Sequence, residues 1–503
     1  MPYHLSKSSF VKGERCPTWL WWTVREPDAP EFELDAATQD RIDQGAHVGR
    51  TAQEYVPGGL RIDRPAWDLE GRIKDTREAL ESGAPVVYEG GFEADGVSVA
   101  VDILKRDEDG VYLIEVKSAT RVKEEHYPDA AIQTHVLRRC GLNVRKAEIM
   151  HLNAECRHPD LSDLFVREDV TGAVEELTPN IPNRIALQLS TINGPCPRIP
   201  IGEQCFDNKE CPFKGRCWPD MTGDHVGALA GVGFKKTFEM MQQGYHSMHD
   251  LPPEVTLTKP AQRQLYSLKR GGVFVGDGLG EALEAFQSPL AFLDFETVSF
   301  AIPVWHGCTP WEHVPVQFSC HIEERTGATT HLAWLADGEE DPREPLARAL
   351  IDACRDARAV VAYYASFERG CIEHLAAALP HLADPLLAIN DKLVDLHPVV
   401  RDHVYHPRFD GSFSLKPVTR ALLPEMAYED LEVQEGLVAS AAIAQLMFRP
   451  DSIADMSLEE FRHNLLAYCE RDTLVMVRLL ALLQDLVGLA RGVNLRGVRE
   501  TNA

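Results

Sequence analysis

The segment LAFLDFETVSF, residues 290–300, is a short apolar run with two acidic side chains at alternating positions, Asp294 and Glu296. Alternate residues of a β-strand lie on one face, so a strand here directs both carboxylates to the same side. Two carboxylates on an otherwise apolar strand are unfavourable unless a cation offsets their charge. The pattern predicts a buried strand that binds Mg²⁺ or Mn²⁺, and two such ions can activate water against a phosphodiester.

Two later segments supply further acids. Residues 357–376, ARAVVAYYASFERGCIEHLA, predict a strand followed by a helix, with Glu368 at the junction. Near the end of the chain, Tyr468 and Asp472 are four residues apart, so they share one face of the predicted terminal helix. Asp395 also ends an apolar segment and is the alternative to Glu368 as the fourth acid.

These segments together resemble DnaQ-like 3′–5′ exonucleases of the RNase H-like fold. Such enzymes take four metal-binding acids from a D-x-E strand, a second strand–helix junction and a late helix. The resemblance implies a set of metal ligands on this chain, namely Asp294, Glu296, Glu368 and Asp472. It also implies that Tyr468 orients the attacking water. The second motif departs from the family, because Glu368 stands where an Asp is usual.

The chain between these motifs contains GSFSLKPVTRALL, residues 411–423, which resembles the connector that follows the second motif in this family. Lys416 lies near the start of the helix predicted there. A lysine in that place is a candidate for contact with a substrate phosphate, and an exposed surface charge is the simpler alternative.

The N-terminal half carries a second acidic pattern. Residues 97–120, VSVAVDILKRDEDGVYLIEVKSAT, predict a β-hairpin with apolar strands on either side of a turn-rich centre. Asp102 lies in the first strand, and Glu115 and Lys117 alternate in the second. Two acids and a lysine on one surface can bind a divalent ion and polarise a water or phosphate.

This hairpin resembles the core of PD-(D/E)XK nucleases of the RecB-like branch. The resemblance implies that Asp102 and Glu115 bind metal and that Lys117 assists catalysis. Three positions depart from or extend the pattern: Val101 replaces a usual Pro, Gln133 matches a downstream glutamine, and Leu137 stands where a Tyr is frequent. In the upstream helix, Gln53 and Glu54 stand where a His is usual. A catalytically silent domain is therefore an open alternative.

Four cysteines lie close together in sequence, Cys196, Cys205, Cys211 and Cys217, and the last three are evenly spaced. Three thiolates need a fourth ligand to hold zinc or an iron–sulfur cluster, and spacing alone leaves both metals open. Resemblance to RecB-like nucleases of the AddB and CRISPR-associated type implies a [4Fe–4S] cluster, with Cys16 as the fourth ligand. Zinc and Cys196 are the alternatives.

The segment between the two patterns is predicted to be a helical connector. Around Gly231 and Gly233 it resembles a helix-hairpin-helix, in which turn amides bind phosphate, and Lys235 and Lys236 follow the turn. A plain helical linker fits the sequence equally well.

Composition sets limits on the class of protein. The chain has 503 residues, of which 44% are hydrophobic, so it can form more than one packed core. Its net charge of −26 counts against extensive phosphate contacts, although a local basic channel suffices for a nuclease. The sequence contains no membrane span and no signal peptide, so a cytoplasmic location is expected, where twelve cysteines are unlikely to form a disulfide framework.

The sequence thus predicts an α/β multidomain protein. Three parts are expected: a RecB-like PD-(D/E)XK domain over 1–222, a helical connector over 223–287, and a DnaQ-like RNase H-fold domain over 288–503. The whole resembles a bacterial family that joins these two nuclease modules. The expected activity is metal-dependent hydrolysis of single-stranded DNA ends, with RNA as another substrate, in repair or defence. The alternative is a nucleic-acid-binding or scaffold protein whose nuclease folds have decayed.

Overall fold

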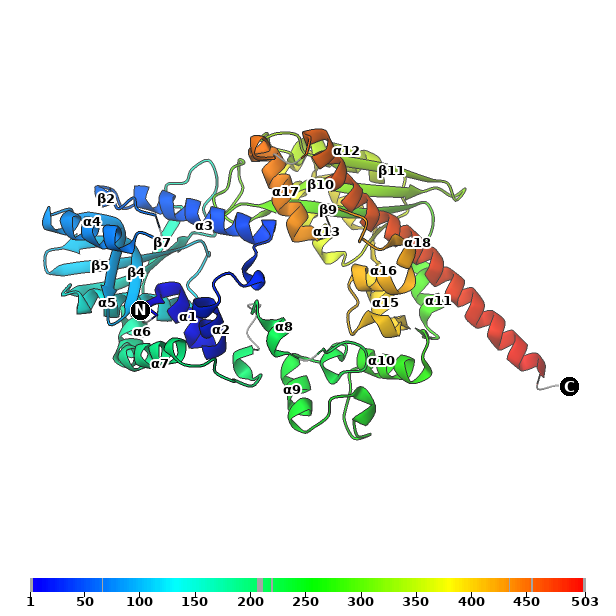
Figure 1. Cartoon of the computed structure of the whole chain (residues 1–503). Helices are drawn as coiled ribbons and strands as arrows, with labels where there is room; N and C mark the ends of the chain where they lie inside the picture. Colours follow the sequence, from blue (N-terminus) through cyan, green and yellow to red (C-terminus); the bar gives the residue numbers. More distant parts are fainter. Residues whose placement is uncertain are drawn as a thin grey trace. The chain divides into compact units, whose positions relative to one another are not determined.

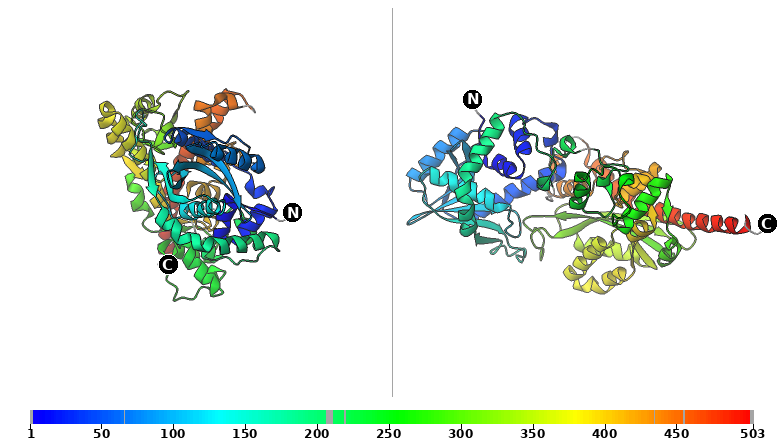
Figure 2. Two further views of the ribbon diagram at one scale, coloured as in Figure 1. Left: turned by 90° about the vertical axis from the view of Figure 1, so that its left-hand side faces the viewer. Right: turned by 90° about the horizontal axis from the view of Figure 1, so that it is seen from below.

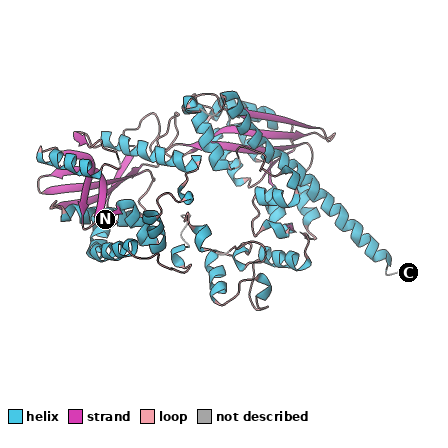
Figure 3. Cartoon of the chain, viewed as in Figure 1, coloured by secondary structure: helices cyan, strands magenta, loops and turns pink. Residues whose placement is uncertain are grey.

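The computed structural model describes residues 3–500 apart from 66, 206–210, 219, 434 and 454–455, with side chains as far as residue 488. The chain divides into two compact units. Unit 1 comprises Met1–Trp218 and Phe300–Glu312, and unit 2 comprises Pro219–Ser299 and His313–Ala503. Each unit has its own mixed β-sheet and helices (Figures 1 and 3). The predicted α/β multidomain class is therefore confirmed.

The sheet of unit 1 has seven strands in the order β2-β3-β4-β5-β6-β7, and β1 pairs with β4. The strands are β1 (Leu5–Ser6), β2 (Gly59–Arg61), β3 (Val86–Ala94), β4 (Val97–Asp107), β5 (Gly110–Lys117), β6 (Val144–Leu152) and β7 (Phe165–Asp169). The β1–β4, β2–β3 and β5–β6 pairs are parallel and the others antiparallel. The hairpin predicted over residues 97–120 is formed by β4 and β5.

Helices of unit 1 pack against this sheet through several hydrophobic clusters. The helices are α1 (Lys7–Arg15), α2 (Pro17–Arg25), α3 (Ala36–Glu54), α4 (Leu69–Glu81), α5 (His126–Arg139), α6 (Thr171–Leu177), α7 (Ile181–Asn193) and α8 (Lys214–Cys217). One cluster joins α1, α2, α5 and α7 to the sheet through residues such as Phe10, Leu20 and Ile132. A separate cluster joins Ala52 of α3 to Ile114 of β5.

The main sheet of unit 2 has the order β11-β10-β9-β12-β13. Its strands are β9 (Leu290–Ser299), β10 (His313–Glu323), β11 (Thr329–Leu335), β12 (Ala359–Ala362) and β13 (Leu393–Asp395). β10 is antiparallel to both β9 and β11, and β12 and β13 run parallel to β9. The strand predicted from LAFLDFETVSF is confirmed as the central strand β9.

The two faces of β9 pack into different cores, as its alternating pattern requires. Leu293 and Phe295 belong to the core that contains helices α12 (Arg343–Cys354), α13 (Ser366–Ala378) and α14 (Ala383–Asn390). Leu290 and Phe292 belong to the core that contains the long helix α18 (Leu458–Glu500). Since Asp294 and Glu296 share the parity of Phe292, both lie on the α18 face.

Other helices of unit 2 complete the α18 side. They are α15 (Leu396–His403), α16 (Leu415–Leu422) and α17 (Gly436–Phe448). The last part of α18 continues beyond the other elements of unit 2 (Figure 2). Among the described residues, no helix combines the length and the apolar character needed to cross a bilayer.

The predicted connector, residues 223–287, forms short helices and belongs to unit 2. Its elements are α9 (Phe234–Gln242), α10 (Lys259–Arg270), β8 (Phe274–Val275) and α11 (Leu279–Ala282), and β8 pairs with β14 (Val404–Tyr405). The amide of Gly276 donates to the carbonyl of His403 at 2.7 Å. Gly411 has φ +79° and lies so close to Ala228 that a Cβ would meet its carbonyl oxygen at 2.0 Å. These contacts join the segment to the later part of unit 2.

Candidate functional site

An acidic cluster lies between β9 and α18 in unit 2. Glu296 and Asp472 are each 8% exposed, and Asp294 is half-buried. Oxygen atoms of Asp294 and Glu296 and the Sγ of Cys469 lie within 4.8 Å of one another. The strand therefore brings its two carboxylates together at the helix that carries Asp472, as the sequence pattern predicts.

The neighbouring carboxylates strongly affect each other. Burial, followed by the charges of Asp472, Glu296 and Glu368, raises the pKa of Asp294 well above its ordinary value. Burial and the charge of Asp472 also raise the pKa of Glu296 well above its ordinary value, while the ammonium of Lys416 opposes this increase. Burial raises the pKa of Asp472 to about 6. Such a concentration of buried carboxylates is stable as anions only with bound cations, so the donor set fits divalent metal ions.

Glu368 is the fourth acid of this cluster. It lies in the first turn of α13 and is 2% exposed, and its Oε2 has no hydrogen-bond partner in the described part of the chain. Burial, with a smaller contribution from Asp395, raises the pKa of Glu368 to about 8. A buried oxygen without a partner is costly, and a metal ion is the partner that the other carboxylates suggest.

Asp395, the alternative fourth acid, serves a structural purpose in this fold. Its carboxylate accepts hydrogen bonds from the amides of Tyr364 and Ala365, both at 3.1 Å, and from the amide of His397 at 2.9 Å. It thereby caps α15 and fixes the loop before α13. Between the two candidates, the geometry favours Glu368.

Tyr468, Lys416 and Tyr428 form a polar layer beside the acids. The Nζ of Lys416 donates to the Oη of Tyr468 at 3.2 Å and lies 5.4 Å from the ring centre of Tyr428. The hydroxyl of Tyr428 donates to Asp472. Burial and the nearby carboxylates raise the pKa of Tyr468, so its phenol stays neutral. The sequence did not single out Tyr428 or Cys469, and only their distances from Asp472 and Asp294 in the fold identify them.

Unit 1 brings together the residues predicted from the hairpin. Glu115 is 2% exposed and accepts hydrogen bonds from Lys117 at 2.7 Å and from Gln133 of α5 at 2.7 Å. Asp102 accepts from the amide of Val116 at 2.7 Å. Burial and the charge of Glu115 raise the pKa of Asp102 to about 8. The two acids therefore lie close together, as the sequence predicts, and Gln133 contacts one of them, Glu115.

Two residues that the sequence did not indicate complete this group. Lys7, the first residue of α1, donates to Glu115 at 2.9 Å and lies 3.7 Å from Asp129 of α5. Lys117 also contacts Asp129. Burial alone would raise the pKa of Glu115, but Lys7 and Lys117 hold it below its ordinary value. Glu115 is therefore an anion that two ammonium groups already neutralise.

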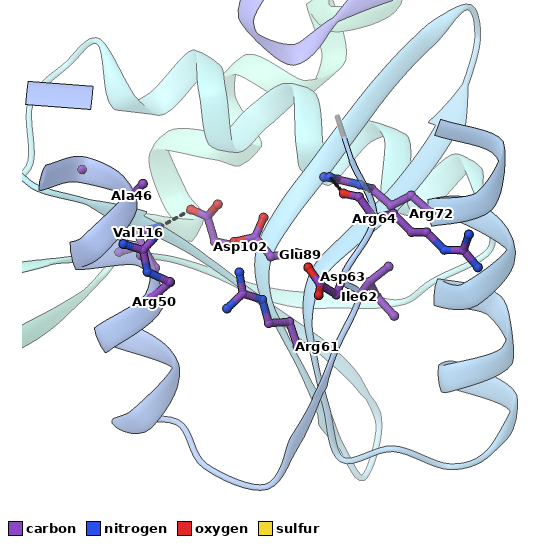
Figure 4. A pocket seen from close by; sticks show the side chains of 12 residues that line it. Ala46, Arg50, Arg61, Ile62, Asp63, Arg64, Arg72, Glu89, Asp102 and Val116 are labelled. Carbon is purple, nitrogen blue, oxygen red and sulfur yellow. Dashed lines mark hydrogen bonds between the residues drawn. The ribbon is translucent and has the colours of Figure 1, made fainter. Parts of the chain in front are cut away.

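A pocket of about 290 Å³ opens beside Asp102 (Figure 4). Arg50 of α3, Arg61 of β2 and Glu89 of β3 line it together with Asp102. Glu89 has φ +57°, a left-handed conformation that is uncommon outside glycine. In the described part of the chain, neither Arg50 nor Arg61 has an ion-pair partner. The upstream helix thus contributes Arg50 to the pocket lining, whereas Gln53 and Glu54 are not among the residues that line it.

The cysteine cluster gathers in unit 1, where each thiol is free. Burial, followed by the neighbouring thiols of Cys211, Cys16, Cys205 and Cys196, raises the pKa of Cys217. The early and late segments are also joined by hydrogen bonds from Thr18 to the carbonyl of Pro197 and from Trp21 to that of Gly194. Among the described residues no three of these thiols lie within 4.8 Å of one another, so the structure does not select the ligands, and Cys16 and Cys196 both remain candidates. Residues 206–210, which separate Cys205 from Cys211, lie outside the described part of the chain.

The remaining predicted positions have ordinary surroundings. Leu137 and Val101 are fully buried in the core of unit 1. In the connector, Gly231 has φ +65° and α9 begins one residue after Gly233. Lys235 and Lys236 are exposed, and Lys236 donates to the carbonyl of Thr256 at 2.9 Å.

Comparison with known families gives one match, to a domain of unknown function called DUF2779, over residues 291–414. The matched span contains Asp294, Glu296 and Glu368 and ends before Lys416. No curated protein matches the chain. The family description names no activity, so any assignment of function rests on the geometry of the site.

Proposed function

We propose that this protein is a divalent-metal-dependent nuclease whose principal active site is the acidic cluster of unit 2. The observation that carries the proposal is the set of four neighbouring buried or half-buried acids, one of which, Glu368, has an Oε2 without a hydrogen-bond partner among the described residues. The position of Asp294 and Glu296 on the central strand β9 also supports it, because the DnaQ-like exonucleases that the motifs resemble carry their D-x-E pair on a strand. The expected reaction is 3′–5′ hydrolysis of single-stranded DNA, with RNA as another substrate.

The roles of the side chains follow from their chemistry. Asp294, Glu296, Glu368 and Asp472 would hold Mg²⁺ or Mn²⁺ ions. When bound, such ions activate a water and stabilise the leaving oxygen of a phosphodiester. The neutral phenol of Tyr468 orients the attacking water by hydrogen bonding. The ammonium of Lys416 holds that phenol in place and adds a positive charge where the substrate phosphate would lie.

Digestion of end-labelled oligonucleotides tests this assignment. Asp294→Asn keeps the shape of the side chain and removes its charge, so digestion with Mg²⁺ or Mn²⁺ should be lost. Asp391→Asn is the matched control, because Asp391 is exposed in the same unit, and its activity should equal that of the wild type. Undiminished 3′–5′ digestion by Asp294→Asn protein would contradict the proposal.

For unit 1 two assignments compete. The RecB-like arrangement of Asp102, Glu115 and Lys117 supports a second nuclease site. The contacts of Lys7 and Lys117 with Glu115 favour instead a nucleic-acid-binding unit without activity, because a metal ion would have to displace an ammonium group. Lys7→Met distinguishes them. If unit 1 holds a nuclease site that Lys7 blocks, the Lys7→Met protein should show more metal-dependent cleavage by unit 1 than the wild type. If unit 1 only binds nucleic acid, this variant should show no cleavage by unit 1.

The cysteines of unit 1 are proposed to hold a [4Fe–4S] cluster, with zinc as the alternative. Either group would join the α1–α2 segment to the segment that ends in α8 and would stabilise the unit without taking part in hydrolysis. The mutual electrostatic influence of the thiols of Cys217, Cys211, Cys16, Cys205 and Cys196 supports this structural assignment.

A further inference from the structure

A group of metal-binding side chains outside the acidic cluster lies on the sheet of unit 2. His321 of β10 and His331 of β11 are directly paired across the two strands, and their rings stack at 4.5 Å between centres. Glu470 projects from α18 to the same place. One ligand atom from each of the three residues lies within 4.8 Å of the others, and the Nδ1 of His331 is 3.6 Å from a carboxylate oxygen of Glu470.

The second nitrogen of each imidazole is occupied by a hydroxyl. The Nδ1 of His321 bonds to the Oγ1 of Thr473 at 2.7 Å, and the Nε2 of His331 bonds to the Oγ of Ser319 at 2.9 Å. The two hydroxyls also bond to each other at 2.7 Å, and Thr473 donates to the carbonyl of Glu470 at 3.1 Å. Imidazoles that bind metals are held in this way by a hydrogen bond at the nitrogen that does not bind.

Counting the protons of this network assigns the free lone pairs. Thr473 has one hydroxyl proton, which it donates to the carbonyl of Glu470, so it accepts from Ser319 and from the Nδ1–H of His321. Ser319 then has no proton left for His331 and accepts from its Nε2–H. This leaves lone pairs on the Nε2 of His321 and on the Nδ1 of His331. Through these two nitrogen atoms the imidazoles of His321 and His331 would bind a metal ion.

The protonation states agree with this arrangement. Burial, with the neighbouring His331, lowers the pKa of His321 to about 4. Burial also lowers the pKa of His331, although the charge of Glu470 opposes the change. Both imidazoles are therefore neutral at neutral pH.

We propose that His321, His331 and Glu470 form a binding site for a divalent transition-metal ion of the Zn²⁺ class. Two imidazole nitrogens and one carboxylate oxygen suit Zn²⁺ and disfavour Mg²⁺, which prefers oxygen ligands. A tetrahedron with bonds of about 2.0 Å has edges of roughly 3.3 Å, close to the His331–Glu470 separation. Glu470 is half-exposed, so water can take the fourth position.

The site would join the edge strand β11 to α18. Glu470 lies between Tyr468 and Asp472 on this helix, so an ion here would fix the segment of α18 that supplies both residues to the acidic cluster. The site needs no nuclease activity to exist. Its test is therefore independent of the proposed function.

Metal binding to the full chain tests the inference. Chelator-treated wild type, His331→Asn and Glu470→Gln proteins are titrated with Zn²⁺ by calorimetry, and bound zinc is counted by elemental analysis after dialysis. His381→Asn is the matched control, since His381 is an exposed histidine 3.3 Å from Glu344 in the same unit. Wild type and His381→Asn should bind one Zn²⁺ more per chain than His331→Asn or Glu470→Gln.

Cobalt separates this site from the cysteines. Co²⁺ at nitrogen and oxygen ligands gives d–d absorption without the sulfur-to-metal charge-transfer band of thiolate sites. The d–d absorption from the nitrogen and oxygen ligands should be absent from the His331→Asn and Glu470→Gln proteins. The charge-transfer band of the thiolates should remain in both. The two substitutions lie on different elements and replace partly exposed side chains, so a common loss with unchanged circular dichroism reports the site. Equal zinc stoichiometry and affinity in all four proteins would overturn the inference.

Discussion

At the scale of single residues, Glu368 connects stability with metal binding. Within the part of the chain that the structure describes, its Oε2 is buried without a hydrogen-bond partner, which costs about 1–3 kcal/mol when no ion is bound. Glu368→Gln removes a carboxyl that can ionise and adds an amide donor to a site surrounded by carboxylates. In the absence of metal it should therefore raise the melting temperature, while it weakens Mn²⁺ binding at least about tenfold. Calorimetric scans and Mn²⁺ titrations measure the two effects.

Glu373→Gln is the control for this prediction, because Glu373 is exposed on the same helix α13. It should change neither quantity. A Glu368→Gln protein that is less stable than wild type in chelator, or that binds Mn²⁺ equally well, would show that Glu368 belongs to the packing of α13 and has no part in a metal site.

Tyr468 is predicted to act on the rate and to have little effect on substrate affinity. Tyr468→Phe keeps the ring but removes the hydroxyl that Lys416 holds. Loss of the group that orients water should lower kcat by about 10²-fold and leave KM and Mn²⁺ affinity almost unchanged. Steady-state kinetics check this, with Tyr266→Phe as the control, since Tyr266 is an exposed phenol on α10. A change confined to KM would instead make Tyr468 a substrate-binding residue.

At the scale of elements, the local sequence pattern predicts the type of an element and which of its side chains share a face. The alternation in LAFLDFETVSF gives both the strand β9 and the common face of Asp294 and Glu296. The sequence did not decide whether Glu368 or Asp395 is the fourth metal-binding acid, because each acid follows an apolar segment. Only the fold shows that Asp395 has three backbone donors and that Glu368 has an oxygen to which no described residue hydrogen-bonds.

Contacts between residues that are distant in sequence could not be predicted from a local sequence pattern. Lys7 lies 108 positions from Glu115, and Tyr428 lies 44 positions from Asp472. Their contacts depend on how α1 packs beside α5 and on the path of the chain before α17. The sequence predicted the types of element, most acids of both sites and the candidates Lys117, Lys416 and Tyr468. Lys7, Asp129 and Tyr428 required the tertiary structure.

The segments at both ends of unit 1 should depend on the cysteine cluster. Cys217→Ser removes one ligand, so protein purified without oxygen should lose the broad visible absorbance of iron–sulfur charge transfer and should unfold at a lower temperature. Cys140→Ser is the control, because Cys140 is an exposed thiol of unit 1 away from the cluster. Colourless wild type with one bound zinc would assign zinc to the site. Wild type without either metal would contradict a metal centre.

At the scale of the whole molecule, the charge of −26 opposes a polyanionic substrate. The proposed binding of nucleic acid would therefore depend on a few local cations, among which Arg50 and Arg61 line the pocket of unit 1. Arg50→Gln should weaken single-stranded DNA binding and reduce the slope of log affinity against log salt by about 1. Fluorescence anisotropy at several salt concentrations measures the slope. Arg355→Gln, an exposed unit 2 arginine paired with Asp352, should leave it unchanged.

The two units have separate cores, so a substitution at one site should leave the other unit folded. This allows the two candidate sites to be separated in the full chain. Lys117→Ala removes the lysine of the unit 1 motif without touching the acidic cluster. Asp294→Asn alters the cluster without touching unit 1.

The most direct test of the central claim follows the digestion of a 5′-labelled single strand with Mn²⁺ by Lys117→Ala protein and by the Lys117→Ala/Asp294→Asn double variant. If the acidic cluster of unit 2 is the catalytic centre, the single variant should give a ladder of products that shorten from the 3′ end, and the double variant should give none. The same ladder at the same rate from both proteins would contradict the claim.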